Sequence, residues 1–130
     1  MSEQSTIDRS LLELPDDATV ARAIAAFASA VRRHYGSRLV GLLLFGSRAR
    51  GDHTLESDAD VAVVLDDEEL DFWREKMVLA DLSYDAILEF GADVQGWPIR
   101  RTEWLDPARH RNPALVRAMQ RDGKVIEAPL

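Results

Sequence analysis

Two aspartates near the middle of this sequence are the residues best placed to do chemistry together. Asp58 and Asp60 stand two positions apart at the start of an apolar run, so their carboxylates project from one face of a β-strand. Neighbouring carboxylates repel each other unless a cation neutralises them, and their oxygens suit Mg²⁺, which also accepts water and phosphate oxygens. The pair therefore indicates a divalent-metal site. The alternative is a solvated strand entrance with capping aspartates.

A glycine–serine pair upstream of the aspartates is suited to phosphate. Gly46 has no Cβ, so the backbone can turn sharply there and a phosphate can approach closely. Ser47 offers a hydroxyl at the start of a short helical turn, where unpaired N–H groups attract anions. Arg48 and Arg50 add positive charge nearby. Combined with the acidic pair, this segment indicates chemistry on a nucleoside triphosphate.

The elements around these residues follow from apolar spacing. A helix is predicted from Asp16 or Asp17, either of which is a suitable N-cap, to Gly36. Residues 38–45 are nearly all apolar and predict an interior strand, and residues 60–65 predict a second strand. The helix is expected to bury one face, which comprises Val20, Ile24, Phe27, Ala28 and Val31.

The second half of the chain predicts further helices and strands. A long helix is expected over residues 68–90, capped by the acidic run that begins at Asp66. Its expected buried stripe is Leu70, Trp73, Met77, Ala80, Tyr84 and Ile87. A third strand is expected over residues 92–99, followed by a short turn that Thr102 could cap. Asn112-Pro113 begins a last helix that Gly123 ends, and residues 124–127 could add an edge strand.

This order of elements predicts the fold class α/β (α+β), a single small domain with a short mixed sheet flanked by helices. Residues 1–15 are expected to form a flexible arm, and residues 16–130 the domain. With 130 residues, the chain has room for one compact domain.

Composition excludes several classes of function. The absence of cysteine rules out disulfides and thiolate chemistry. A net charge of -7 disfavours nucleic acid as the main partner. No apolar run approaches the roughly 20 residues that span a bilayer, and the polar N-terminus has no signal-peptide core. We therefore expect a cytoplasmic protein that does not bind membranes.

The pattern Gly46-Ser47, ten residues, then Asp58-Ala59-Asp60 resembles the signature of the polymerase-beta-like nucleotidyltransferase superfamily. The version Gly-Ser-Arg-Ala-Arg-Gly in so short a chain is similar to the minimal nucleotidyltransferases (MNT proteins). The resemblance implies a third carboxylate on a later strand, a position that Asp93 matches. Asp81 and Asp85 compete for this role but lie in the long helix and are expected to face solvent. The alternative for Asp93 is an ordinary turn aspartate after Gly91.

The resemblance also implies a reaction and a partner. AMP would pass from ATP to a hydroxyl group, with two Mg²⁺ ions held by Asp58, Asp60 and Asp93. The nucleotide would be bound by Gly46, Ser47, Arg48 and Arg50. MNT proteins resembling this one are antitoxins that adenylylate a helical HEPN-type ribonuclease toxin. The lack of room for an acceptor-binding domain also favours a protein partner.

Two alternatives to this function remain. One is nucleotidylation of a small molecule such as an aminoglycoside, in a pocket that a homo-oligomer would build. The other is a non-catalytic antitoxin that acts by binding alone.

The histidines and tryptophans are assigned structural roles. No two of the three histidines have metal-ligand spacing. Trp73 is expected in the core with the helical stripe, and Trp104 could be an exposed partner contact. Trp97 has the same strand parity as Asp93, so it could line the site, although core or interface packing is favoured.

Overall fold

A four-stranded mixed sheet with strand order β3-β2-β1-β4 forms the middle layer of the computed structural model, which describes residues 14–127. The strands are β1 (Leu39–Phe45), β2 (Ala59–Leu65), β3 (Val94–Arg100) and β4 (Lys124–Glu127). β1 pairs antiparallel with β2 and with β4, whereas β2 and β3 are parallel. The predicted small α/β fold with a mixed sheet is therefore confirmed, including the edge strand at residues 124–127.

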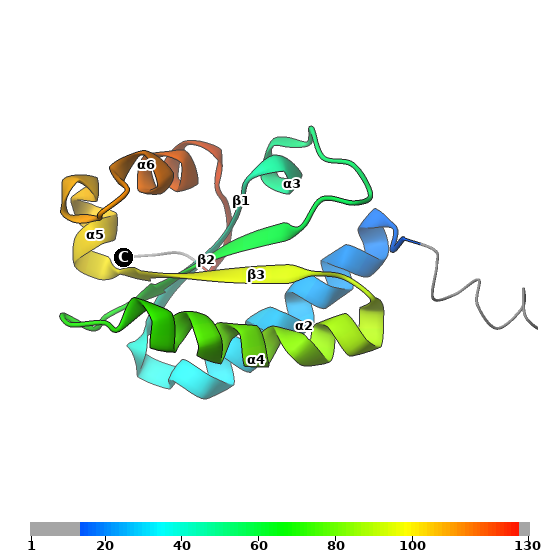
Figure 1. Cartoon of the computed structure of the whole chain (residues 1–130), viewed down its shortest axis with the longest axis horizontal. Coiled ribbons are helices and arrows are strands. Elements are labelled where there is room, and N and C mark those ends of the chain that lie inside the picture. Colours follow the sequence, from blue (N-terminus) through cyan, green and yellow to red (C-terminus); the bar gives the residue numbers. More distant parts are fainter. Residues whose placement is uncertain (1–13, 128–130) are drawn as a thin grey trace, which may run out of the picture.

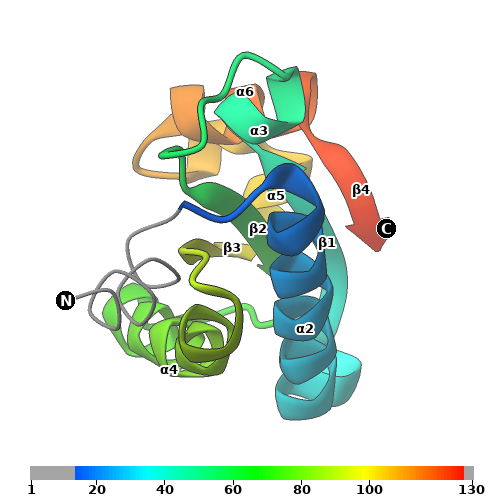
Figure 2. The ribbon, with the colours of Figure 1, turned by 90° about the vertical axis from the view of Figure 1, so that its right-hand side faces the viewer.

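Helices cover both faces of the sheet (Figure 1). The long helices α2 (Asp17–Tyr35) and α4 (Phe72–Phe90) lie side by side on one face, as Figure 2 shows. The short helices α3 (Ser47–Arg50), α5 (Arg101–Leu105) and α6 (Pro113–Asp122) lie on the other. Two 3₁₀ turns, η1 (Gly36–Arg38) and η2 (Pro107–Arg109), connect these elements. The face that carries the short helices is only partly covered, and the candidate site opens on it.

Helix α2 forms as its sequence predicts. The side chain of Asp16 accepts a hydrogen bond from the Thr19 amide at 2.8 Å, so Asp16 is the N-cap. Gly36 ends the helix with a φ of 56°, a conformation that glycine adopts at little cost. Its buried residues are Val20, Ala23, Phe27, Ala28, Val31 and Tyr35.

The beginning of α4 was predicted too early. The helix begins at Phe72, and its N-cap is Asp71, whose carboxylate accepts a hydrogen bond from the Arg74 amide at 3.1 Å. The preceding acidic run lies in the connection from β2, where Asp67 pairs with Arg38 at 2.7 Å. These carboxylates therefore stabilise the connection instead of forming the first helical turn.

The predicted buried stripe of α4 was wrong in phase. Trp73, Met77 and Tyr84 are exposed, at 65%, 70% and 57% of their surface, so Trp73 is not a core residue. The side chains that α4 buries are instead Glu75, Leu79, Ser83 and Ala86.

The inner face of α4 combines the apolar side chains Val78, Leu79 and Leu82 with the buried polar residues Glu75 and Ser83. Glu75 is buried because its Oε1 accepts a hydrogen bond from the Tyr35 hydroxyl of α2 at 3.0 Å. Leu79 packs so closely on β3 that a Cβ at Gly96 would lie 2.9 Å from the Leu79 Cβ. This approach is possible because Gly96 has no Cβ. Both faces of α4 carry apolar residues at helical spacing, so apolar spacing alone selected the wrong face.

The core consists of two hydrophobic clusters, one on each face of the sheet. The larger cluster fills the space under α2 and α4. The smaller one includes Val116 and Met119 of α6, and Trp104 packs against it. Trp104 is thus half-buried in the core and not an exposed contact.

The predicted arm over residues 1–15 falls outside the described residues except for Leu14 and Pro15. Within the described part of the chain, no helix combines the length and apolar character needed to cross a bilayer.

Candidate functional site

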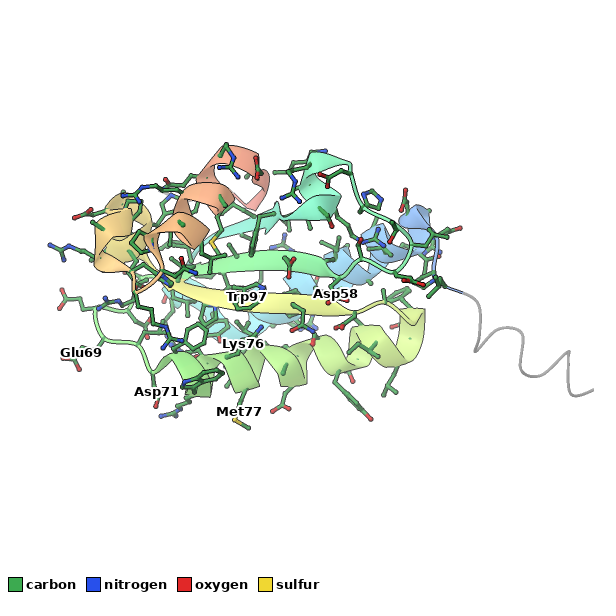
Figure 3. The ribbon with its side chains drawn as sticks, turned by 45° about the horizontal axis from the view of Figure 1, so that its top comes forward. Asp58, Glu69, Asp71, Lys76, Met77 and Trp97 are labelled. Atoms are coloured by element: carbon green, nitrogen blue, oxygen red, sulfur yellow. The ribbon has the colours of Figure 1, made fainter. Side chains whose placement is uncertain are left out.

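The three predicted carboxylates gather at one end of the parallel strand pair. Asp60 of β2 is in register with Gln95 of β3, and Ala59 with Val94, so Asp58 and Asp93, which directly precede the two strands, are at matching positions. The amide of Ala59 donates to the Asp93 carbonyl at 3.0 Å, which fixes this alignment. Because side chains alternate along a strand, all three carboxylates project from the face opposite α2 and α4. Asp58 is labelled at this end of the sheet in Figure 3.

The Gly46-Ser47 turn lies directly beside this carboxylate group. Phe45, the last residue of β1, is paired with Asp60, so the chain enters the turn next to that aspartate. Gly46 has a φ of 77°, and a Cβ added there would lie 2.9 Å from Oδ2 of Asp60. Only glycine satisfies both the backbone conformation and this close approach. The structure therefore brings together the two halves of the sequence motif.

The first turn of α3 begins at Ser47. The amides of Ala49 and Arg50 both donate to the Gly46 carbonyl at 3.1 Å. The amides of the first residues of any helix have no partner within the helix, and here they belong to Ser47 and Arg48. The turn thus offers N–H donors and a hydroxyl near Asp60, a combination that can bind phosphate oxygens.

Burial and the repulsion between neighbouring carboxylates raise the pKa values of Asp58 and Asp60. Burial raises the pKa of Asp58, and the neighbouring Asp93 and Asp60 carboxylates raise it further. Burial also raises the pKa of Asp60, although the Trp97 hydrogen bond and the Lys76 charge oppose this shift. The site therefore concentrates negative charge that the protein only partly compensates, and a bound cation would relieve this repulsion.

The donor set suits a hard cation. All three side chains offer oxygen ligands, and Mg²⁺ commonly uses one or two carboxylates and completes its shell with water and phosphate. Within residues 14–127, no three His, Cys, Asp or Glu side chains already converge as a ready-made metal cage. The chemistry of the donors fits an ion that shares its ligands with a substrate.

Arg48 is turned away from the surface and holds the loop that leads to Asp58. Only 8% of the residue is exposed. Its Nε donates to the Ser57 carbonyl at 2.8 Å, and its Nη2 donates to the Thr54 carbonyl at 3.3 Å. Its Nη1 donates to Asp17 at the start of α2, at 3.2 Å. Arg48 therefore fixes the residue that immediately precedes Asp58.

Arg50 lies on the exposed side of α3. It pairs with Asp52 at 3.1 Å and with Asp122, at the end of α6, at 3.6 Å. These carboxylates, and not the Asp60 group, are its neighbours in the structure.

Trp97 and Gln95 of β3 hold two of the carboxylates in place. The indole Nε1 of Trp97 donates to Oδ1 of Asp60 at 3.1 Å. The side-chain amide of Gln95 donates to Oδ1 of Asp93 at 2.7 Å. Strand parity pointed to Trp97 as a lining residue, and the same parity includes Gln95, which sequence reasoning missed.

Lys76 is the other residue that sequence reasoning missed. Its Nζ lies 4.0 Å from the centre of the Trp97 ring and donates to the Gly96 carbonyl at 2.6 Å. Figure 3 shows Lys76 directed from α4 toward β3 and Trp97. Burial lowers the pKa of Lys76, while Asp60 and Asp93 favour its charged form. The correct phase of α4 would have placed Lys76 on the side that faces β3.

A cleft of about 160 Å³ opens beside the carboxylates. Its lining includes Asp58, Asp93, Arg48 and Leu55. Small-molecule pockets usually enclose about 300–1,000 Å³, so this cleft accommodates only part of a nucleotide. The remainder of such a ligand would lie across the open face of the sheet.

Comparison with known proteins identifies a curated relative and solved structures with a similar fold. A candidate protein adenylyltransferase of Methanocaldococcus jannaschii is 37% identical over 70 residues, which cover 54% of this chain and 63% of that protein. The match therefore spans less than two thirds of the relative's length.

Solved structures share the fold. A chain of a toxin–antitoxin crystal structure with AMP-PNP has a TM-score of 0.54 and 22% identity, covering 78% of this chain and 71% of that one. A chain of a mutant of the toxin–antitoxin MntA-HpeT has a TM-score of 0.52 and 23% identity, covering 78% and 69% respectively. At these identities the likeness concerns the fold alone.

The family match covers the whole candidate site. Residues 24–104 match the family described as nucleotidyltransferase domain, and this range begins within α2 and ends within α5. It includes the Gly46-Ser47 turn, both motif aspartates and Asp93. Because the match extends over more than half of the sequence, the chain belongs to the nucleotidyltransferase domain family, and the predicted nucleotidyltransferase enzyme is confirmed at this level.

Proposed function

We propose that this protein transfers the AMP group of ATP, with Mg²⁺, to a hydroxyl group of a partner protein. The observation that carries the proposal is the approach of Gly46 to Asp60, with Asp58 and Asp93 at the same sheet end. This arrangement sets a phosphate-binding turn against oxygen ligands for a divalent ion. Nucleotidyl transfer requires that pairing, because the metal and the phosphates must be bound together.

A protein acceptor and an antitoxin role are proposed from the relatives. The curated relative is named as a candidate protein adenylyltransferase, and two of the solved chains with this fold come from toxin–antitoxin structures. We propose that this chain is likewise an antitoxin, and that its partner is a helical HEPN-type ribonuclease toxin that AMP transfer neutralises.

Each site residue has a proposed role. Gly46 and Ser47 would bind triphosphate oxygens through backbone N–H groups and the serine hydroxyl. Asp58, Asp60 and Asp93 would hold Mg²⁺, as two ions when ATP and acceptor are both present. Bound Mg²⁺ would supply positive charge against the triphosphate and the developing charge on its phosphorus.

The two arginines would act at different distances from the phosphates. Arg48 would act through the loop, since its hydrogen bond to the Ser57 carbonyl positions Asp58. Arg50 would reach a phosphate only by exchanging its present contacts with Asp52 and Asp122.

The transfer step requires one proton acceptor. The acceptor hydroxyl oxygen would attack the α-phosphorus and form a new P–O bond while its proton passes to the Asp93 carboxylate. The bond from the α-phosphorus to the bridging oxygen would break in line, and pyrophosphate would leave. Gln95 orients Asp93 for this role through its 2.7 Å hydrogen bond.

The test is direct transfer of label. The purified chain is incubated with ATP labelled at the α-phosphate, with Mg²⁺ and with the product of the neighbouring gene. The intact mass of each protein is then measured by mass spectrometry. We expect an AMP-sized addition to the partner, which disappears with D58N and D60N. Label that appears only on added aminoglycosides would instead support the small-molecule alternative. Unchanged protection of cells by D58N/D60N would support an antitoxin that acts by binding alone.

A further inference from the structure

The side chain of Lys76 connects the two faces of the sheet. Lys76 belongs to α4, whereas the side chains of Gln95 and Trp97 lie on the other face, with the carboxylates that they contact. In the described sheet β3 is an edge strand, and the Lys76 Nζ donates to the Gly96 carbonyl at 2.6 Å. Lys76, which Figure 3 shows directed toward Trp97, therefore reaches round the unpaired edge of β3.

Two contacts of the Lys76 ammonium lead to the residues that hold Asp60 and Asp93. Its Nζ lies 4.0 Å from the centre of the Trp97 ring, and the Trp97 indole donates to Asp60 at 3.1 Å. The same Nζ donates to Oε1 of Gln95 at 3.4 Å, a long hydrogen bond. The Gln95 amide nitrogen in turn donates to Asp93 at 2.7 Å. Lys76 thus contacts both side chains that orient these carboxylates.

Lys76 also determines which way the Gln95 amide points. An ammonium group offers only donors, and a carboxylate offers only acceptors. The Gln95 amide lies between one of each, so its oxygen faces Lys76 and its NH₂ group faces Asp93. The reversed amide would set oxygen against carboxylate and NH₂ against ammonium. The cation beside Trp97 likewise favours one position of that ring, because aromatic faces attract cations.

We propose that Lys76 is a positioning residue for the transfer reaction, which orients Asp93 through Gln95 and Asp60 through Trp97. This inference rests on the proposed function and adds to it a residue from the helix that lies on the far side of the sheet. Because Lys76 acts through these two side chains, its loss should slow the transfer step. Binding of ATP at the turn before α3 should change little.

Steady-state kinetics of Lys76→Met test this division of effects. The substitution removes the ammonium group and keeps an unbranched side chain. Misplacing a catalytic group by about 1 Å can cost about a hundredfold in rate, so kcat for AMP transfer should fall about ten- to a hundredfold. KM for ATP should remain close to that of the wild type. A raised KM with an unchanged kcat would mean that Lys76 binds the triphosphate directly, and would overturn the proposal.

Chemical rescue tests the ammonium group itself. The chain has no cysteine, so Lys76→Cys introduces a single thiol. Alkylation with 2-bromoethylamine rebuilds a side chain with the length and charge of lysine and should restore most of the lost rate, whereas iodoacetamide adds a neutral group and should not. Met77→Cys is the matched control, because Met77 is 70% exposed and points away from the sheet in Figure 3. Neither reagent should change its rate. Equal recovery with both reagents at position 76 would contradict the proposal.

A combined variant tests the route through β3. In the Gln95→Leu/Trp97→Phe background, Lys76→Met should lower kcat by less than about twofold further, because residues that act as a unit are not additive. The same loss as in the wild-type background would show that Lys76 acts by another route.

The Trp97 indole N–H provides a readout that does not require activity. Its signal in a nitrogen–proton correlation spectrum is identified by its loss in Trp97→Phe, and Mg²⁺ alone should shift it in the wild type, since Asp60 accepts from this group. Lys76→Met should move the signal and raise the Mg²⁺ concentration needed for half of the change, while the dispersion of the other signals confirms folding. A Trp97 signal that Lys76→Met leaves unchanged overturns the inference, whether or not AMP transfer is found. If the wild type transfers no AMP but these spectral changes occur, the proposed function fails and the positioning of Asp60 by Lys76 stands.

Discussion

A single close approach, between Gly46 and Asp60, joins the Gly46-Ser47 turn to the carboxylates for which we propose a metal-binding role. Gly46 has a positive φ, and a Cβ at this position would lie 2.9 Å from a carboxylate oxygen of Asp60. Gly51, at the other end of α3, has a φ of 85° but no atom within 4 Å of such a Cβ. A side chain at either glycine would strain the backbone, but only one at Gly46 would also contact Asp60. Comparing substitutions at the two positions therefore distinguishes the effect of strain from the effect of this contact.

This difference gives a matched pair of variants. Gly46→Ala should abolish AMP transfer, because the new methyl group displaces Asp60 as well as straining the turn. Gly51→Ala should cost about 1 kcal/mol of stability from strain alone and retain most of the activity. Initial transfer rates and urea unfolding measure the two effects. Equal activity of the two variants would mean that the contact with Asp60 has no part in the reaction.

The raised pKa of Asp60 predicts how stability depends on pH. The folded protein binds this proton more tightly than the unfolded chain, so stability is lost as pH rises from the usual 3.8 through the raised pKa. In EDTA at neutral pH, D60N should therefore melt above the wild type, because it removes the buried charge while its amide oxygen still accepts from Trp97. Below pH 3.8 the difference should vanish. A D60N protein that melts below the wild type at neutral pH would contradict this account.

At the scale of elements, α4 has one buried face and one exposed face, and both carry apolar residues. The buried face depends on a polar contact, because Tyr35 of α2 donates to Glu75 at 3.0 Å. Burial, together with the Glu75 carboxylate, raises the pKa of Tyr35 far above its usual value, so the hydroxyl remains a donor at any ordinary pH. The contact fixes α4 against α2.

Removing this donor should loosen the helix pair. Tyr35→Phe leaves Glu75 without its hydroxyl partner and should lower the free energy of unfolding by about 1–3 kcal/mol. Glu75→Gln is the control, because its amide oxygen can still accept from Tyr35 and it should cost less. Urea denaturation of both variants makes the comparison. A larger loss for Glu75→Gln would show that the carboxylate charge, and not the hydrogen bond, holds the helices together.

The sequence was informative where local rules decide the structure. The end of α2 at Gly36 follows from residue type and spacing, and the N-cap was narrowed to Asp16 or Asp17, of which the structure uses Asp16. The motif spacing also predicted that the acidic pair lies beside the Gly46 turn, where the structure places Asp60. The phase of α4 did not follow, because both of its faces carry apolar residues at helical spacing and the buried face also includes the polar residues Glu75 and Ser83. Lys76 was missed for the same reason, since its role depends on the phase of the helix that carries it.

At the scale of the molecule, binding of a ligand to the folded protein should raise its free energy of unfolding. A ligand that binds only the folded state at about one hundred times its dissociation constant adds about 2.7 kcal/mol. ATP with Mg²⁺ should therefore raise the melting temperature of the wild type by several degrees, while the D58N/D60N variant should gain little. Differential scanning fluorimetry measures both. An equal rise in the two proteins would show that the aspartates do not hold the nucleotide complex.

The lysine at the edge of the sheet has a consequence for the behaviour of the protein in concentrated solution. β3 is an edge strand, and unpaired edge carbonyls can recruit a strand from another molecule. Lys76 donates to the Gly96 carbonyl at 2.6 Å and sets a positive charge beside that edge. We therefore expect Lys76 to disfavour the growth of sheets from copy to copy at β3, and with it aggregation through this edge.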